Sequence, residues 1–250
     1  MTYRKLLAAA LLAATPLAAL HAAPPAYITA AVADTTRPAD DVALDAERKP
    51  AEMLAFAGVK PGMTVVDIVP GGGYFTRLFA DVVGPNGKVV DYVPDEMING
   101  SKDPAKALDR LTSLAKIKPN IMPVHDKLLD PAPPAQSDVA WTSQNYHDLH
   151  NIPGADLVGF NKQIFINLKP GGVYIVLDHA AAAGSGLRDT NTLHRIDPAV
   201  VKQEVTAAGF VFVGESKVLA NPADDHTLKV FDPTLRHRTD QFIYKFRKPK

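Results

Sequence analysis

Short apolar runs alternate with stretches of helical periodicity along most of the chain. The short runs are rich in β-branched residues and predict strands; they cover residues 65–69, 87–91, 121–124, 138–143, 173–179, 210–219 and 241–246. Helical spacing of apolar residues, with proline at the start or glycine at the end, predicts helices between them; these cover residues 50–57, the stretch that opens near Tyr74, and residues 104–114, 152–168 and 198–208.

This order of elements predicts the fold class. Strands that alternate with helices form a parallel sheet with helices on both faces. No helix is predicted between the last two strands, so these two must reverse direction and pair antiparallel. We therefore expect an α/β fold with a doubly wound, mostly parallel seven-stranded sheet and an antiparallel last strand. Ligands of such sheets bind outside the carboxyl ends of the strands.

The N-terminal region differs in character from the rest of the chain. Arg4 and Lys5 precede an apolar run of 15 residues that ends at Leu20, which is typical of a secretory signal peptide over residues 1–22. A retained membrane anchor is the weaker alternative, because spanning a bilayer takes roughly 20 apolar residues. Residues 23–41 contain three prolines and are expected to form an extended N-terminal arm. Residues 42–250 then form a single domain.

Composition narrows the class of protein further. The chain has 46% hydrophobic residues, enough for a full core, and its 27 basic residues balance 27 acidic residues. No basic stripe is interleaved with aromatic residues, so nucleic acid is not an expected partner. The absence of cysteine excludes disulfides and a lipidated cysteine. We expect an exported, most simply periplasmic, protein without a stable membrane anchor after signal cleavage, and the sequence assigns no oligomeric state.

A glycine turn follows the first strand of the predicted sheet. Gly71, Gly72 and Gly73 lie between that strand and the helix that opens near Tyr74. Glycine lets a ligand approach the backbone closely, and free N–H groups at a helix start point toward the same space. Asp91 follows Gly71 by twenty residues, about the distance at which dinucleotide-type folds place a ribose-binding carboxylate. The pattern predicts a nucleoside site.

These motifs resemble the class I S-adenosylmethionine-dependent methyltransferases over nearly all of residues 42–248. The resemblance rests on the glycine turn, on the acid of the second strand, on Asp126 after the third strand, and on the sequences DVAWTSQNYHDL and LKPGGVYIVLDH. Within the superfamily, the PGGGY turn and the ending at residues 239–242 are similar to those of a group of predicted exported methyltransferases. The resemblance implies a Rossmann-like methyltransferase fold and S-adenosylmethionine as the cofactor.

The resemblance also implies roles for individual residues. Asp67, Gly71 and Gly73 would line the methionine end of the cofactor, beside the helix start at Tyr74. Asp91 would bind the ribose hydroxyls, and Asp126 would face the adenine. The sequence departs from the pattern of the family at one position, because Val69 replaces the usual glycine two residues after the acid. A branched side chain there would narrow the approach of the cofactor.

Histidines near the carboxyl edge of the sheet are candidates for a catalytic base. Methyl transfer needs mainly positioning, and an oxygen or nitrogen acceptor also needs a group that takes its proton. Histidine titrates closest to neutral pH, and His147, His150, His179 and His194 are all predicted near this edge. His147 is our first candidate and His179 our second; the alternative for each is a structural histidine.

A metal site is the weaker hypothesis for the same residues. His147, His150, Asp178 and His179 offer nitrogen and oxygen ligands. Metal-dependent O-methyltransferases of the superfamily use acidic residues at the ends of strands four and five. Asp178 matches one of these places, but Ser143 stands where the other carboxylate is expected. We therefore expect no metal.

Three other classes of function compete with transfer of a methyl group to a small molecule. A non-catalytic exported binding protein could keep the fold, as the export signal and Val69 both suggest. An NAD-dependent oxidoreductase is weaker, because no separate catalytic domain is predicted and the Tyr244–Lys248 spacing falls in the terminal strand and tail. A hydrolase using Ser143 or Ser185 is weaker still, since neither serine lies in a G-x-S-x-G turn.

Overall fold

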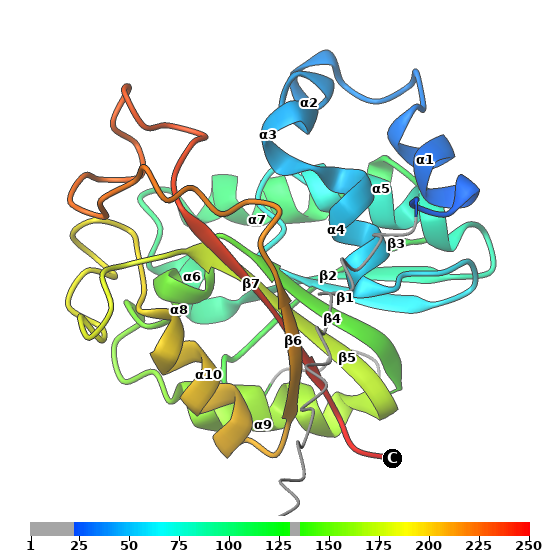
Figure 1. Cartoon of the computed structure of the whole chain (residues 1–250). Helices are drawn as coiled ribbons and strands as arrows, with labels where there is room; N and C mark the ends of the chain where they lie inside the picture. Colours follow the sequence, from blue (N-terminus) through cyan, green and yellow to red (C-terminus); the bar gives the residue numbers. More distant parts are fainter. Residues whose placement is uncertain (1–22, 131–135) are drawn as a thin grey trace, which may run out of the picture.

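The computed structural model describes residues 23–130 and 136–250, so the predicted signal peptide lies outside the described residues. A seven-stranded sheet of order β3-β2-β1-β4-β5-β7-β6 forms the centre of the molecule (Figure 1). Its strands are β1 Thr64–Ile68, β2 Lys88–Pro94, β3 Ile121–Asp126, β4 Ser137–Ser143, β5 Leu168–His179, β6 Val211–Ser216 and β7 Gln241–Arg247.

The first five strands are parallel, and β7 pairs antiparallel with both β5 and β6. Strand order reverses between β1 and β4, so the carboxyl ends of these two strands flank a crevice suited to a ligand. The prediction of a doubly wound, mostly parallel sheet with an antiparallel last strand is confirmed.

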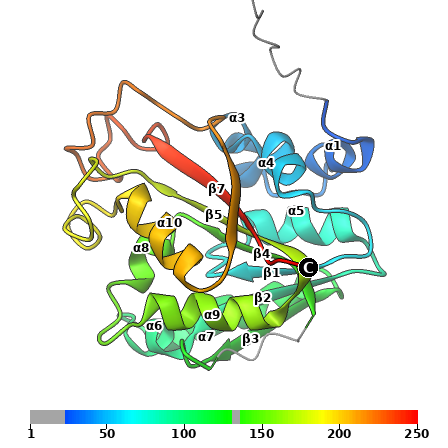
Figure 2. The same cartoon turned by 60° about the horizontal axis from the view of Figure 1, so that its bottom comes forward.

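Helices cover both faces of the sheet (Figures 1 and 2). One face carries α1, α4 and α5, and the other carries α9 and α10. The helices are α1 Ala26–Val32, α2 Ala39–Ala43, α3 Asp45–Arg48, α4 Pro50–Ala57, α5 Tyr74–Val83, α6 Asp95–Asn99, α7 Pro104–Ser113, α8 Tyr146–Leu149, α9 Leu157–Asn167 and α10 Pro198–Ala207, and a short 3-10 helix covers Leu114–Lys116.

Alternate residues of the central strands face opposite cores. Val65 belongs to the core under α1, α4 and α5, whereas Val66 belongs to the core under α9 and α10. Trp141 of β4 is fully buried against Phe75 and Phe79 of α5. Burial of such large side chains from both faces holds the carboxyl ends of the strands in fixed positions.

The expectation of an extended arm over residues 23–41 is wrong. This segment forms α1 and the start of α2, and Ile28 is fully buried against the α4 and α5 face. Pro25 and Pro38 each stand directly before a helix. Proline is compatible with a helix start, so these prolines mark helix boundaries rather than extended chain.

Two strands extend at least three residues beyond their predicted bounds. β2 continues past Asp91 to Pro94, and β5 begins at Leu168 rather than at Val173. In β5 the expected KPGG turn is held in the sheet because the backbone of Gly171 and Gly172 pairs with Lys248 beyond β7. The extension of β2 moves Asp91 away from the strand end. No helix within residues 23–130 and 136–250 has both the length and the apolar character needed to cross a bilayer.

Candidate active site

The glycine turn at the end of β1 has the conformation that its residues predict. Gly71 has φ +59° and Gly73 has φ +79°, values that glycine adopts without strain. A Cβ on Gly71 would meet nothing within 4 Å, whereas a Cβ on Gly73 would lie 2.6 Å from Leu114 Cδ2. The two glycines therefore have different roles. Gly71 faces open space, and Gly73 allows Leu114 to pack closely against the turn.

Val69 is held in the left-handed region with φ +55°. Such a backbone is an outlier for a β-branched residue and costs on the order of 1 to 3 kcal/mol. Two hydrogen bonds fix it: its N–H donates to the Tyr92 carbonyl (2.7 Å), and its carbonyl accepts from Asn145 Nδ2 (2.9 Å). Strain of this kind persists where the surrounding structure imposes it, which is common at ligand sites.

Two pockets meet at this turn and share Val69, Pro70 and Gly71. The first pocket, of about 260 Å³, lies beside the end of β1. Besides the shared residues it is lined by Asp67 and Tyr74, and by Asp41, Leu44, Arg48, Gly72, Phe75, Ser143, Gln144 and Asn145. The second pocket, of about 460 Å³, lies beside the end of β2; its remaining lining residues are Val93, Met97, Ile98, Ser101, Lys102, Asp103, Lys106, Ala107, Arg110 and Leu111. Its size is within the range of small-molecule sites, roughly 300 to 1,000 Å³.

The N-terminal helices build one wall of the first pocket. Tyr74 donates its hydroxyl to Asp45 Oδ1 (2.6 Å), and the Arg48 guanidinium lies 4.5 Å from the Tyr74 ring centroid. Asp45 is in turn paired with the buried Arg37 at 2.7 Å. Burial and the neighbouring Asp45 raise the pKa of the Tyr74 hydroxyl, so it stays protonated and fixed in this wall.

The structure brings together only some of the predicted cofactor residues. Asp67, Gly71 and Tyr74 line the first pocket, where Gly72 takes the place expected for Gly73. Asp126 ends β3, where its carboxylate accepts the Lys127 N–H at 2.8 Å. Asp126 is not among the residues that line either pocket.

The expectation that Asp91 ends its strand is wrong, and Asp91 is not among the residues that line either pocket. Asp91 lies in the middle of β2, in register with Asp67 of β1, and is fully buried. Both side chains point under α5, where Thr76 Oγ1 lies 2.8 Å from Asp67 Oδ2 and 3.0 Å from Asp91 Oδ1. The apolar run of β2 extends three residues beyond Asp91, and this extension hides the carboxyl from both pockets.

Asp67 and Asp91 form a buried acid pair that holds a proton near neutral pH. Burial raises the pKa of Asp91 to about 7, although the hydrogen bond from Thr76 lowers it. Burial and the charge of Asp91 raise the pKa of Asp67 as well. Two carboxylates this close cannot both ionise readily. Thr76 can donate to the ionised member and accept from the protonated one.

This pair predicts a fall in stability as pH rises. Between about pH 4 and pH 7 the native Asp91 keeps a proton that an unfolded carboxyl, with its ordinary pKa of 3.8, has released. The native state then binds more protons than the unfolded state, so the free energy of unfolding decreases with pH, by roughly 4 kcal/mol at most. Asp91→Asn should show a smaller decrease and should be more stable than the wild type at pH 8.

Urea unfolding at pH 5 and pH 8 measures the effect. Other groups titrate in the same window, so the informative quantity is the difference between the variant and the wild type at each pH. Asp126→Asn, at a partly exposed carboxyl, is the control and should follow the wild type. Parallel pH profiles for Asp91→Asn and the wild type would contradict the shared proton.

The two predicted catalytic histidines lie side by side at the carboxyl ends of β4 and β5. Their ring centroids are 6.1 Å apart. His147 of α8 contacts the buried Asp178 twice: the Nδ1 atom lies 2.8 Å from Oδ1, and the backbone N–H donates to Oδ2 at 2.8 Å. His179 Nδ1 lies 2.7 Å from Thr239 Oγ1. His150 instead contacts Glu204 at 3.1 Å.

The charges of these histidines argue against His147 as a base. Burial lowers the pKa of His147, but the carboxylates of Asp178 and Asp148 outweigh burial and raise it to about 10. His147 therefore carries a proton at neutral pH. Burial lowers the pKa of His179 to about 4, so this ring is neutral there. Of the two, His179 is the one free to accept a proton, although it is a weak base.

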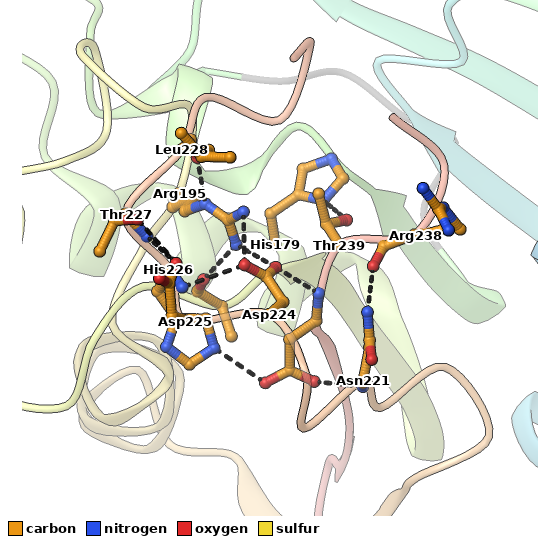
Figure 3. A network of polar contacts seen from close by, with 12 residues as sticks. His179, Arg195, Asn221, Asp224, Asp225, His226, Thr227, Leu228, Arg238 and Thr239 are labelled. Carbon is orange, nitrogen blue, oxygen red and sulfur yellow. Dashed lines mark hydrogen bonds and ion pairs between the residues drawn. The ribbon is translucent and has the colours of Figure 1, made fainter. Parts of the chain in front are cut away.

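A buried ion pair fastens the segment before β7 over this edge (Figure 3). Arg195 and Asp224 are fully or almost fully buried and are 2.9 Å apart. Arg195 also donates to the carbonyls of Ala180 and Leu228, and Asp224 accepts the backbone N–H groups of His226 and Asp240. The pair therefore fixes Thr239, which adjoins Asp240, against His179.

The sequence analysis did not predict several residues of the site. Arg48 and Asn145 line the first pocket, and Thr76 bridges the acid pair. Thr76 follows the glycine turn by three residues, so its place on the first turn of α5 beneath β1 was open to prediction. Arg48 comes from the segment before the fold-defining strands, and its contribution depends on packing alone.

Comparisons with known proteins agree with this geometry. Residues 26–112 match the model of the protein-L-isoaspartate(D-aspartate) O-methyltransferase family. This match spans α1 to α7 and includes the glycine turn. No curated protein matches the chain.

Solved methyltransferase structures share the fold. A putative sarcosine dimethylglycine methyltransferase from Galdieria sulphuraria is 18% identical, with a TM-score of 0.57 over 84% of this chain and 88% of that one. An S-adenosylmethionine-dependent methyltransferase from Mesorhizobium loti is 16% identical, with a TM-score of 0.56 over 82% of this chain and 100% of that one. The chain has the fold of the class I S-adenosylmethionine-dependent methyltransferase superfamily. The sequence-based prediction of this fold is confirmed.

The class I fold also hosts other chemistry. The cyclase SpnF is 14% identical to the chain, with a TM-score of 0.57 over 84% of this chain and 81% of that one. Function in a shared fold resides in the site and not in the fold itself. In this chain, the glycine turn and the two pockets lie at the topological switch point of the sheet, where such sheets bind ligands.

Proposed function

We propose that the protein binds S-adenosylmethionine across the two pockets and transfers its methyl group to an oxygen or nitrogen atom of a small molecule. The observation that supports this most directly is the junction at Gly71. Its open, left-handed backbone joins a nucleoside-sized pocket to a polar pocket within a class I methyltransferase fold. The methionine end would lie in the first pocket and the nucleoside in the second.

The residues of the first pocket suit the zwitterionic end of the cofactor. Asp67 offers a carboxyl group to the ammonium, and Arg48 offers a cation to the carboxylate. The sulfonium would then face the side of the pocket formed by Asn145 and the following helix α8. Bound there, the cofactor supplies an electrophilic methyl group, and the protein contributes orientation and exclusion of water.

Calorimetric titration tests this function. The protein should bind one S-adenosylmethionine per chain, and should bind S-adenosylhomocysteine at the same site. NAD should produce no heat of binding. Binding of NAD alone would replace the proposal with an oxidoreductase, and the transfer itself is measured as acceptor-dependent release of S-adenosylhomocysteine.

A second candidate function is a binding protein that keeps this fold without turnover. The specific observations in its favour are the strained Val69 at the junction and the burial of Asp91, which leaves the second pocket with Asp103 as its one carboxylate among the described lining residues. This candidate would be favoured if the titration showed no binding of S-adenosylmethionine, S-adenosylhomocysteine or NAD. We also propose a location outside the cytoplasm, from the N-terminal sequence; fractionation of cells that express the full chain tests it.

A further inference from the structure

A cluster of two imidazoles and one carboxylate lies at the start of α8. One ligand atom from each of His147, Asp148 and His194 lies within 4.8 Å of the other two. His147 Nε2 is 3.3 Å from Asp148 Oδ1, and His194 Nδ1 is 3.5 Å from the same oxygen. Three donor atoms that converge in this way are the geometry of a site for a small cation.

The Nε2 atom of His147 is a further observation for the site. The His147 side chain is only 3% exposed. Among the residues that the structure describes, its Nε2 atom makes no hydrogen bond and has only the ion-pair contact with Asp148 Oδ1 at 3.3 Å. A buried polar atom without a partner is rare in proteins and calls for an explanation such as a bound ion. Nearby are the carboxylate oxygen of Asp148 and the ring of His194. The centroids of the His147 and His194 rings are 5.5 Å apart.

The residues behind the cluster hold it in the form that a metal requires. Asp178 contacts His147 Nδ1 at 2.8 Å, which leaves the opposite ring nitrogen for a ligand bond. A carboxylate behind a metal-binding histidine is a recurrent arrangement that fixes the ring and raises its basicity. His194 is the residue before Arg195, and the buried contacts of Arg195 hold this part of the chain over α8.

We propose that His147, Asp148 and His194 bind one divalent transition-metal ion, with Zn²⁺ as the best match. Two nitrogen ligands and one oxygen ligand suit Zn²⁺ and related transition ions, whereas Mg²⁺ prefers an all-oxygen set. The ion takes the place of the proton on His147 Nε2, and that proton is released to solvent. Three protein ligands leave a position for one exogenous oxygen ligand.

This site differs from the one weighed from the sequence. His150 is engaged by Glu204, and Asp178 and His179 do not belong to the cluster. Ser143 occupies the place where a carboxylate was expected, but Asp148, five residues later, supplies one. His194 comes from the loop between β5 and α10, and its distance in sequence from His147 concealed the pairing.

Zinc titration of the metal-free protein tests the proposal. The purified protein is treated with a chelator and titrated with Zn²⁺, then with Mg²⁺, in a calorimeter; Co²⁺ provides an optical signal for nitrogen ligation. We expect each chain to bind one Zn²⁺ ion, and we expect Mg²⁺ not to compete for the site. Asp148→Asn and His194→Ala, at partly exposed positions, should each weaken Zn²⁺ binding at least ~10-fold.

His125→Ala is the matched control. It removes another histidine in contact with an aspartate, at 2.7 Å from Asp95, on β3 at the opposite side of the sheet. It should bind Zn²⁺ as the wild type does. Absence of Zn²⁺ binding, equal affinity in His194→Ala and the wild type, or tight Mg²⁺ binding would each overturn the proposal. No nucleoside is present, so the result stands apart from the test of methyl transfer.

Discussion

Asp224→Ala is expected to lower the free energy of unfolding by about 3 to 5 kcal/mol, because it leaves the Arg195 guanidinium charged and buried without a carboxylate partner. Arg195 is completely buried, so solvent cannot replace the lost carboxylate. The substitution also removes the acceptor of two backbone N–H groups, those of His226 and Asp240. For a chain of this size the midpoint of thermal unfolding should fall by roughly 10 °C.

Asp225→Ala provides the comparison. Asp225 is the adjacent residue and accepts hydrogen bonds from Thr227, but it is exposed and has no part in the ion pair. Its replacement should leave the unfolding midpoint close to that of the wild type. Thermal unfolding followed by circular dichroism measures both variants. Equal midpoints for Asp224→Ala and Asp225→Ala would show that the pair in Figure 3 does not stabilise the fold.

Gly71→Asn is expected to weaken S-adenosylmethionine binding at least about 100-fold, or about 2.8 kcal/mol, with little loss of stability. Asparagine tolerates positive φ better than other residues with a side chain, so the turn should survive. The new side chain starts in the open space where the two pockets meet. It would therefore occupy the path of a ligand that spans both pockets.

Gly62→Asn controls for the backbone effect. Gly62 has φ +79°, and a Cβ there would also meet nothing within 4 Å. It precedes β1, however, and so lies at the opposite end of this strand from the pockets. Calorimetry should give wild-type affinity for this variant. Undiminished affinity in Gly71→Asn would place the cofactor elsewhere, and a matching loss in both variants would assign the effect to the backbone.

Sequence periodicity predicted the sheet and the main helices well. The starts of α4, α7 and α10 were marked by Pro50, Pro104 and Pro198. The reversal of β6 and β7 followed from the lack of a helix between them. These features depend on local chemistry that a short window of residues contains. The same local reasoning failed for residues 23–41, where prolines that begin helices were interpreted as breaks.

Site residues were harder to predict because their roles depend on register and on distant contacts. Asp91 had the expected spacing from Gly71, but three further strand residues buried it beside Asp67. His147 was found by its place after β4, yet its charge is set by Asp178, which is 31 residues away in sequence. Sequence position indicates which edge a side chain reaches, and its protonation state follows from neighbours that only the fold brings near.

The first pocket lies next to a hollow that joins segments from both ends of the described chain. Its wall includes Asp41 and Arg48, and the neighbouring helix α3 borders a hollow whose other side is formed by residues 218–241. A chain that is made from its N-terminus onward therefore completes this region late, when the last strand has entered the sheet. Partly synthesised chains would lack the C-terminal side of this hollow, and a protease cut between α2 and α4 would open the finished one.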